Sequence, residues 1–143
     1  MNKILIVGCG HMGSALLNAW YKKTSINISV VDPNSYKNLK KKYSNKITVY
    51  KSLETINAIE DFNTIIFAIK PQIAREVVSQ YNFLHNKRIL FLSIVAGKKI
   101  KFFEKYLHYP HQIIRAMPNM PAFVAKGMTC FVANDLTSKK NKK

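Results

Sequence analysis

Short apolar runs alternate with longer segments of mixed polarity along most of the chain. Buried strands are expected where a run is short and rich in β-branched residues, at residues 3–7, 28–31, 47–50, 64–69, 88–94 and 112–116. Between these runs, recurring apolar residues predict helices at residues 14–23, 35–43, 72–81 and 99–107. Residues 52–55, Ser-Leu-Glu-Thr, resemble the capped start of a further helix. This alternation is typical of an α/β fold, with a doubly wound, mostly parallel sheet and helices on both faces.

The first apolar run leads directly into a glycine-rich loop. Gly8, Gly10 and Gly13 form the pattern G-x-G-x-x-G, with a predicted strand before it and a predicted helix after it. In this context the first glycine permits a tight turn, the second lets backbone N–H groups approach a pyrophosphate, and the third lets the helix pack closely. The helix N-terminus offers unpaired N–H groups and a positive dipole end to the phosphates. The pattern therefore predicts a Rossmann-type domain that binds a dinucleotide.

An acidic residue, Asp32, follows the second predicted strand at about 20 residues from the glycines, as this fold requires. A carboxylate here accepts hydrogen bonds from an adenosine ribose and repels a 2′-phosphate, which favours NAD. The segment 32–34, Asp-Pro-Asn, is also good turn chemistry, and both interpretations can hold together. Lys37, Lys40 and Lys41 follow closely and would attract a 2′-phosphate. The sequence leaves the choice between NAD and NADP open.

Length and composition indicate one domain with a real core, because the chain has 143 residues and is 48% hydrophobic. We predict a dinucleotide-binding domain over residues 1–134 and a polar, lysine-rich tail without fixed structure over residues 135–143. No apolar run approaches the ~20 residues of a membrane span, and the chain opens on a core strand, so we expect a cytoplasmic protein. Cys9 and Cys130 form no metal-binding pattern and are expected to remain reduced.

The formal net charge of +16 raises the possibility of nucleic-acid binding, since clustered Lys and Arg side chains release counterions from a phosphate backbone. The lysines are instead spread over predicted surface helices and the C-terminal tail. No arginine–aromatic array or recognition-helix motif accompanies them. We therefore expect no specific nucleic-acid partner and only weak attraction to polyanions.

Three later strand ends carry short motifs on the side of the sheet where such domains bind ligands. The motifs are A-I-K-P at residues 68–71, S-I-V-A-G at residues 93–97, and R-A-M-P-N-M-P-A at residues 115–122. Gly97 lets the backbone approach a flat ring, and Asn119 supplies an amide beside it. Taken singly, each motif also fits an ordinary loop at a strand end.

Together and in this order, the glycine loop and the three motifs resemble the N-terminal domain of pyrroline-5-carboxylate reductase. The resemblance extends over residues 1–134 and includes Gly-Met-Thr at residues 127–129, where the family has a glycine and then a strand. It implies hydride transfer from NADH or NADPH to the C=N bond of 1-pyrroline-5-carboxylate, which gives L-proline. Related reductases of other imines, ketones or deazaflavins share the glycine loop but are not expected to show Met-Pro-Asn.

The resemblance also implies which residues contact the cofactor. The pyrophosphate loop would consist of Gly8, Gly10, His11, Met12 and Gly13. The adenosine end would meet Asp32, Pro33, Asn34 and Ser52. The nicotinamide half would be bordered by Ala68, Ile69, Lys70, Pro71, Ala96, Gly97, Met117 and Asn119. We identify no catalytic acid, because in such reductases the cofactor carries the chemistry and protein groups mainly orient it.

The chain also departs from the family. His11 stands where Asn or Gln is usual, Asp32 where a small hydroxyl residue often receives the 2′-phosphate, and Met120 where Thr is common. Family members continue into a helical domain that forms the homo-oligomer and supplies a serine- and glycine-rich substrate loop. Nothing in this sequence matches that loop.

Two hypotheses follow from this departure. The chain belongs to a working reductase, with the helical half missing or supplied separately, or it is a remnant or module that binds a dinucleotide without turnover. In both cases we expect little or no activity from the chain alone, since substrate positioning accounts for much of the rate. We also expect an exposed apolar surface near the positions that would face the second half, at Met120, Phe123, Val124 and Phe131.

Overall fold

The computed structural model describes residues 2–23, 25–118 and 128–142, of which Ser44 is described by its backbone only. The strands in these residues are β1 (Asn2–Val7), β2 (Ile26–Val31), β3 (Thr48–Tyr50), β4 (Thr64–Phe67), β5 (Leu90–Ser93), β6 (Gln112–Pro118) and β7 (Thr129–Ala133). The α-helices are α1 (His11–Trp20), α2 (Tyr36–Tyr43), α3 (Ala74–Ser79) and α4 (Ile100–Leu107). None of the helices described is long and apolar enough to cross a membrane.

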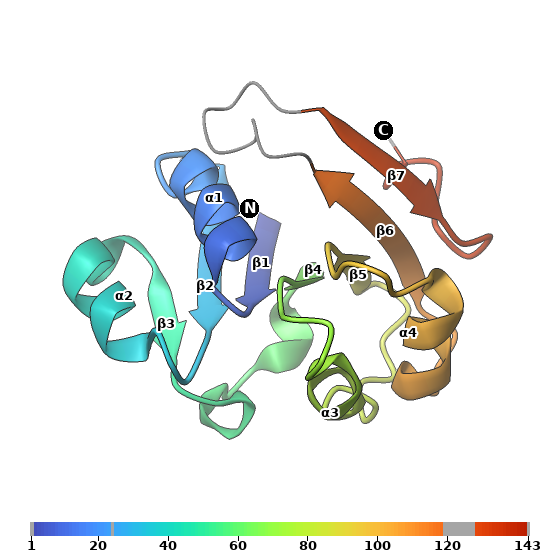
Figure 1. Ribbon diagram of the computed structural model, residues 1–143, viewed down its shortest axis with the longest axis horizontal. Helices are drawn as coiled ribbons and strands as arrows, with labels where there is room; N and C mark the ends of the chain where they lie inside the picture. The colour runs from blue at the N-terminus through green and yellow to red at the C-terminus, as the bar shows by residue number, and fades with distance from the viewer. Residues whose placement is uncertain (1, 24, 119–127, 143) are drawn as a thin grey trace.

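The strands of the described residues form one seven-stranded sheet in the order β3-β2-β1-β4-β5-β6-β7 (Figure 1). Neighbouring strands from β3 to β6 run parallel, whereas β7 runs antiparallel to β6 at one edge. The order from β3 to β6 is that of doubly wound dinucleotide-binding folds. The predicted α/β fold with a mostly parallel sheet is confirmed.

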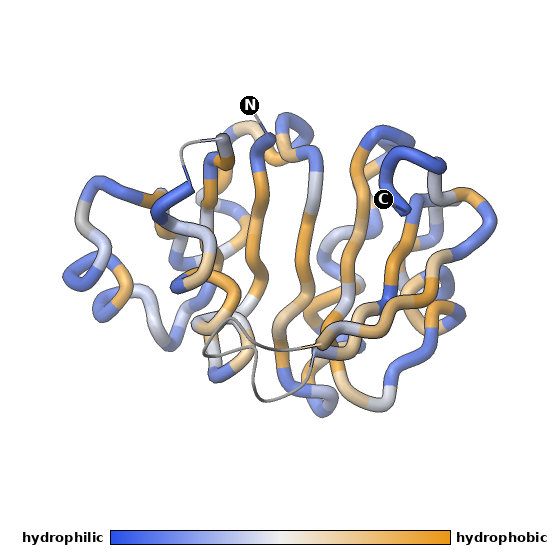
Figure 2. The backbone as a smooth tube through the Cα atoms, turned by 90° about the horizontal axis from the view of Figure 1, so that it is seen from above, coloured by the Kyte–Doolittle hydropathy of each residue, from blue (hydrophilic) through white to orange (hydrophobic). Residues whose placement is uncertain are grey.

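Successive residues of the central strands pack against helices on opposite faces of the sheet. Leu5 and Val7 of β1 belong to a core cluster that includes residues of α3 and α4, whereas Ile6 belongs to a second cluster with residues of α1 and α2. Burial of both faces requires continuous apolar strands, and the strands in Figure 2 are predominantly apolar. Helices α1 and α2 therefore cover one face, and α3 and α4 cover the other (Figure 1).

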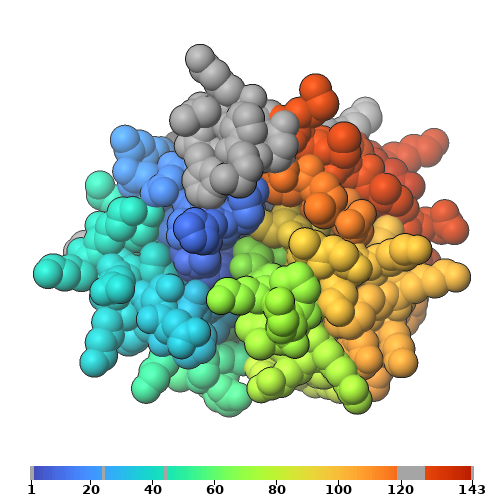
Figure 3. Space-filling model, in the orientation of Figure 1, coloured from blue at the N-terminus to red at the C-terminus, as the bar shows by residue number. Residues whose placement is uncertain are grey.

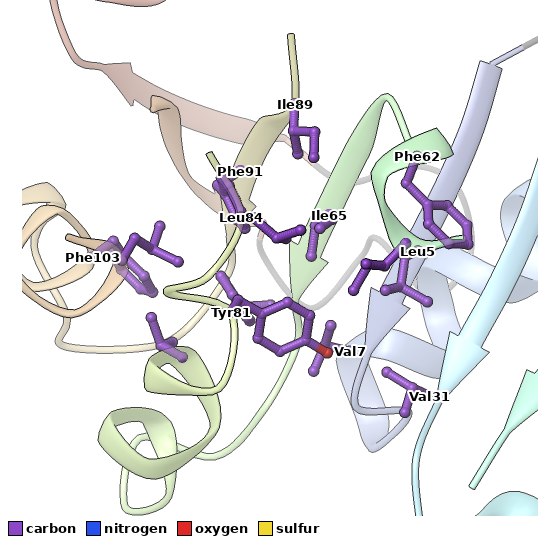
Figure 4. Packing of buried hydrophobic residues seen from close by; sticks show 14 of the residues in the cluster. Leu5, Val7, Val31, Phe62, Ile65, Tyr81, Leu84, Ile89, Phe91 and Phe103 are labelled. Atoms are coloured by element: carbon purple, nitrogen blue, oxygen red, sulfur yellow. The ribbon is translucent and has the colours of Figure 1, made fainter. Parts of the chain in front are cut away.

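The core cluster on the α3 and α4 face fixes the end of β4 through aromatic packing. The ring of Phe67 stacks on Phe91 at 5.8 Å and on Phe103 at 5.9 Å between centroids, and it meets Tyr81 edge-on at 5.3 Å. Figure 4 shows part of this cluster, with the ring of Tyr81 among residues of the strands. Because Phe67 is the last residue of β4, this packing also holds the turn that follows it.

The segment between β3 and β4 differs from the prediction. The helix expected to begin at residues 52–55 is a single 3-10 turn, Leu53–Thr55, and the Ser52 side chain makes no capping hydrogen bond. Ile56 then takes an extended conformation, and its side chain packs into the core with those of Ile59 and Phe62. A helical turn therefore starts where it was expected, after Ser52, but it does not continue as a longer helix, because these buried residues hold the chain in short turns.

Large apolar side chains remain exposed on and around β7. Their exposed fractions are 72% for Met128, 53% for Phe131, 60% for Val132 and 53% for Leu136. Apolar surface was expected at Phe131, and the structure places it there. The other positions of that expectation lie outside the described residues, namely Met120, Phe123 and Val124.

Residues 135–142 form turns that return to β6. Thr137 is buried, and its hydroxyl donates to the Ile113 carbonyl at 3.2 Å. The Gln112 side-chain oxygen accepts hydrogen bonds from the Ser138 backbone N–H and from the Asn141 side-chain amide, each at 2.9 Å. The structure differs here from the prediction of a tail without fixed structure, because a buried hydroxyl and one glutamine side chain hold the segment against the strand.

A buried histidine, His111, lies just before β6 and is 1% exposed. Its ring packs against Phe91 at 4.6 Å and Tyr109 at 5.0 Å between centroids. The ring nitrogens lie near the backbone of Leu84 and Asn86 without forming hydrogen bonds of normal geometry. Burial of this ring lowers the pKa of His111 below its usual value.

The lowered pKa of His111 predicts acid-sensitive stability. In the unfolded chain the His111 ring takes up a proton near pH 6.5, whereas in the folded chain it does so only at lower pH. The free energy of unfolding is therefore undiminished by this group above about pH 6.5 and decreases as the pH falls below that value. His111→Phe keeps an aromatic ring and is expected to flatten the dependence of melting temperature on pH between about 7 and 5. The matched control is His108→Asn at an exposed histidine. Equal slopes for wild type and His111→Phe would contradict the prediction.

Candidate dinucleotide-binding site

The carboxyl ends of the parallel strands meet at one edge of the sheet. Val7 of β1 lies in register with Val31 of β2 and with Phe67 of β4, and Phe67 lies in register with Ser93 of β5. The chain leaves β1 for α1 on one face and leaves β4 for α3 on the other, so β1 and β4 flank the topological switch point. In Figure 3 the N-terminal surface (blue) lies between that of the α2 region (cyan) and that of the α3 region (light green). Ligands of such sheets bind outside the carboxyl ends of the strands, at the switch point.

The turn after β1 requires glycine at its first position. Gly8 has φ +87°, and its N–H donates to the Val31 carbonyl at 2.9 Å. A Cβ on Gly8 would lie 2.7 Å from the Ala68 carbonyl oxygen and 2.7 Å from Ile69 Cγ2. A Cβ on Gly13 would collide with the Gly8 carbonyl oxygen. The glycine loop, helix α1 and the end of β4 therefore approach one another more closely than side chains allow.

Gly10 differs from the other two glycines of the loop because it faces open space. It is exposed, precedes α1 as its N-cap, and a Cβ built on it would meet no atom within 4 Å. The first backbone N–H groups of a helix lack partners within the helix and attract anions. Residues 11–14, which form the first turn of α1, include no acidic side chain. The loop thus presents free space and positive potential where a pyrophosphate would lie.

The carboxylate of Asp32 is bound within the protein. One oxygen accepts the Cys9 N–H at 2.7 Å, and the other accepts the N–H groups of Asn34 at 2.9 Å and Ser35 at 3.0 Å. The Asp32 N–H donates to the Tyr50 carbonyl at 3.2 Å, and the residue is 8% exposed. Asp32 thereby joins the glycine loop, the turn after β2 and the end of β3.

A hollow of about 480 Å³ lies beside this turn. Its walls come from the turn after β2, the first turn of α2 and the residue after β3, namely Pro33, Asn34, Tyr36, Lys37, Asn38 and Lys51. Pro33 and Asn34 were predicted for the adenosine end, and Ser52 follows Lys51 directly. Lys51 was missed, although it follows the third strand, which neighbours the second in the usual strand order.

The other half of the edge contains the turns after β4 and β5. The Ala68 N–H donates to the Val7 carbonyl at 2.8 Å, which holds residues 68–71 beside the glycine loop. Ala96 and Gly97 are both exposed. Gly97 has φ +70°, and a Cβ at Gly97 would meet no atom within 4 Å. The buried Ser93 hydroxyl accepts the Val95 N–H at 3.1 Å and fixes this turn.

The structure places the described candidate residues at one edge of the sheet, although they come from six separate segments. Met117 lies near the end of β6 and is 38% exposed. Lys70 and His11 are exposed, whereas Met12 and Pro71 are half-buried. Asn119 lies outside the described residues.

Cys9, the second residue of the loop, fills the turn and is not available as a nucleophile. It is 5% exposed, and its sulfur lies 3.5 Å from the Ser14 hydroxyl. That hydroxyl also donates to the Cys9 carbonyl at 3.1 Å. Burial raises the pKa of the Cys9 thiol, so the unreactive protonated form is favoured.

The strand order, the glycine loop at the switch point and the open N-terminus of α1 define a dinucleotide-binding α/β domain. The chain belongs to the family described as "NADP oxidoreductase coenzyme F420-dependent", whose sequence profile matches residues 3–97. It is therefore a member of an NAD(P)-dependent oxidoreductase family.

Individual relatives carry the comparison over nearly the whole chain. The chain is 34% identical over 139 residues to pyrroline-5-carboxylate reductase of Escherichia coli (strain K12), covering 95% of this chain and 51% of the relative. The solved reductase from Coxiella burnetii matches with a TM-score of 0.85 and 25% identity, over 97% of this chain and 52% of that chain. The Plasmodium falciparum enzyme with NADP bound matches with a TM-score of 0.79 and 25% identity, over 99% and 51%.

These matches confirm the resemblance to the N-terminal, dinucleotide-binding half of pyrroline-5-carboxylate reductases. The chain spans about half the length of the curated relatives that it matches. The comparisons therefore concern the domain that binds the cofactor, and the activity of the whole reductase is a separate question.

The different surroundings of Gly8 and Gly10 predict opposite responses to alanine. Gly8→Ala introduces a Cβ at positive φ against the β4 turn and is expected to cost at least about 1–3 kcal/mol of unfolding free energy. Gly10→Ala places the same group in open space, so at most about 1 kcal/mol is expected, from weaker capping of α1. Urea unfolding of both variants measures this difference, and equal destabilisation would contradict the close contact at Gly8.

Proposed function

We propose that this chain is the dinucleotide-binding half of a pyrroline-5-carboxylate reductase. It would hold NADPH or NADH for reduction of the C=N bond of 1-pyrroline-5-carboxylate to L-proline. The observation that carries the proposal is the open space at Gly10, above the N-terminus of α1 and beside the tight contact of Gly8 with Ala68. The similarity to reductases of this name over 95% of the chain supports the choice of substrate.

The proposed role of the chain is to bind and orient the cofactor. The backbone N–H groups at the start of α1 would hold the pyrophosphate, with Gly10 providing the space for its approach. Residues 68–71 and Gly97 would border the nicotinamide, which supplies the hydride when it is bound. The hydrogen bond from the Ala68 N–H to the Val7 carbonyl and the aromatic packing of Phe67 keep residues 68–71 in place. A fixed border limits the ring to one orientation, which is the contribution to rate expected of such a site.

We propose that the substrate is positioned in part by a second, helical half. The curated relatives are about twice as long as this chain, and Phe131, Val132 and Met128 leave an apolar surface exposed around β7. Exposed apolar patches of this kind are typical of interfaces. The same observations favour the alternative that the chain alone is a dinucleotide-binding module without turnover.

Titration with NADPH and NADH tests the proposal. We expect each nucleotide to raise the melting temperature of the chain. We also expect the fluorescence of the reduced nucleotide to change when it binds. Gly10→Ala should weaken binding at least about 10-fold with little loss of stability, because its Cβ enters the space that the pyrophosphate needs. Gln80→Ala at the C-cap of α3 is the control. A folded chain that responds to neither nucleotide would exclude the proposed function.

Turnover separates the working reductase from the module. We expect the chain alone to oxidise NADPH or NADH on addition of 1-pyrroline-5-carboxylate at least about 10³-fold more slowly than a full-length relative, because most of the positioning of the substrate is missing. The decrease in nucleotide absorbance, measured beside the Escherichia coli enzyme, gives this ratio. Comparable rates would show that no second half is required.

A further inference from the structure

Strand β7 forms one edge of the sheet, and the described residues pair with it only on the side of β6 (Figure 1). Its sequence, Thr-Cys-Phe-Val-Ala, contains no charged residue, proline or glycine, and its pairing with β6 is continuous. The first four residues are exposed. Natural sheets usually protect an edge with charges, proline or a bulge, because an unprotected edge pairs readily with another strand. β7 has none of these protections.

The hydrogen bonds at the end of β7 show which of its backbone groups face outward. The Asn134 N–H donates to the Ile113 carbonyl at 3.0 Å, and the two residues lie opposite each other at the end of the ladder between β6 and β7. Hydrogen-bonded and non-hydrogen-bonded pairs alternate along an antiparallel ladder. The residues whose N–H and C=O groups point away from β6 are therefore Thr129, Phe131 and Ala133.

These outward groups require a strand as their partner. A helix satisfies its backbone groups within itself, so the helical half proposed above would cover side chains of β7 and leave its backbone edge unpaired. A second copy of the chain supplies an identical strand, and two antiparallel edges of one sequence are self-complementary about a two-fold axis.

The charge of the segment after β7 favours the antiparallel arrangement. Lys139, Lys140 and Lys142 follow the C-terminal end of the strand. Antiparallel pairing places these lysines of the two copies at opposite ends of the contact, whereas parallel pairing would bring them together and make them repel each other.

We propose that two copies of this chain associate through β7, which pairs antiparallel with β7 of the second copy and joins the two sheets. Phe131 lies at the two-fold axis and exchanges backbone hydrogen bonds with its counterpart. Thr129 bonds with Ala133 of the second copy, so every outward group finds a partner. Cys130 then lies opposite Val132 of the second copy, at a non-hydrogen-bonded position where side chains are closest. The inference goes beyond the proposed function, because it does not involve the cofactor site.

Sedimentation equilibrium at a series of protein concentrations tests the association. A contact made by one short strand from each copy is small and therefore weak, so we expect mainly monomer at about 1 μM and mainly dimer at about 300 μM. The formal net charge of +16 opposes the contact, and salt screens this repulsion. The fraction of dimer should therefore rise between low and physiological ionic strength.

Phe131→Lys tests whether β7 is the contact. The substitution sets two ammonium groups opposite each other at the two-fold axis and should weaken dimerisation at least about 10-fold. Phe83→Lys is the matched control, because Phe83 lies in the turn after α3 and is 51% exposed, against 53% for Phe131. It removes a similar apolar surface and adds the same charge, and it should leave dimerisation unchanged.

Val132→Cys tests the register. Its thiol would lie opposite Cys130 of the second copy, where about 4.5 Å between Cα atoms suits a disulfide. Cys130 is exposed, so we expect a covalent dimer on a non-reducing gel after treatment with oxidised glutathione. Wild type and Val132→Cys/Cys130→Ser place their exposed thiols diagonally, about 7–8 Å apart, and should cross-link at least about 10-fold more slowly.

The outcomes decide between this pairing and other contacts. Dimers that weaken in Phe131→Lys and cross-link preferentially in Val132→Cys support the inference. A chain that stays monomeric at about 300 μM overturns it, as does association that Phe131→Lys leaves intact or cross-linking that is equally fast in wild type. Should Phe131→Lys fail to fold, the cross-linking series still decides. The titrations with NADPH and NADH are separate measurements, so failure of the pairing leaves the proposed function in place.

Discussion

The site depends on the close approach of three backbone segments at the switch point of the sheet. Gly8 turns against the Ala68 carbonyl, and Gly13 brings α1 against Gly8, at distances that leave no room for a Cβ. The contact of Gly8 with Ala68 exists because β1 and β4 are paired neighbours, although some sixty residues separate them in the sequence, as the pairing of Ile4 with Thr64 shows. This approach places the N-terminus of α1 at the switch point beside the turn after β4, and the packing of Phe67 holds that turn.

The charged residues at the proposed adenosine end differ in burial: Asp32 is buried, whereas Lys37 and Lys51 are exposed. The negative charge of Asp32 is satisfied inside the protein, where it joins three segments of backbone. Lys37 and Lys51 are exposed and line the hollow beside the same turn. The Asp32 carboxylate therefore acts on the shape of the loop, whereas Lys37 and Lys51 border the hollow beside it.

The two edges of the sheet differ in how much apolar side-chain surface the described residues leave exposed. On the β3 side the helices α1 and α2 cover the strands, and Tyr43, Leu39 and Ile47 close the second core cluster. At the other edge Phe131 and Val132 remain more than half exposed. Since the relatives of this chain are about twice its length, the exposed edge is where the domain and the rest of a reductase are proposed to meet.

The sequence by itself determined the alternation of strands and helices, the glycine loop and the family resemblance, because these depend on local periodicity and on motifs that lie close together in the chain. It did not show that the helix expected to start at residues 52–55 ends after one 3-10 turn, and it left both roles of Asp32 open. Only the tertiary structure decided that the Asp32 carboxylate is occupied, since the Cys9 N–H that binds it comes from another segment. Lys51 joins Lys37 for the same reason: sheet pairing, unlike helical spacing, brings together residues that are distant in the sequence.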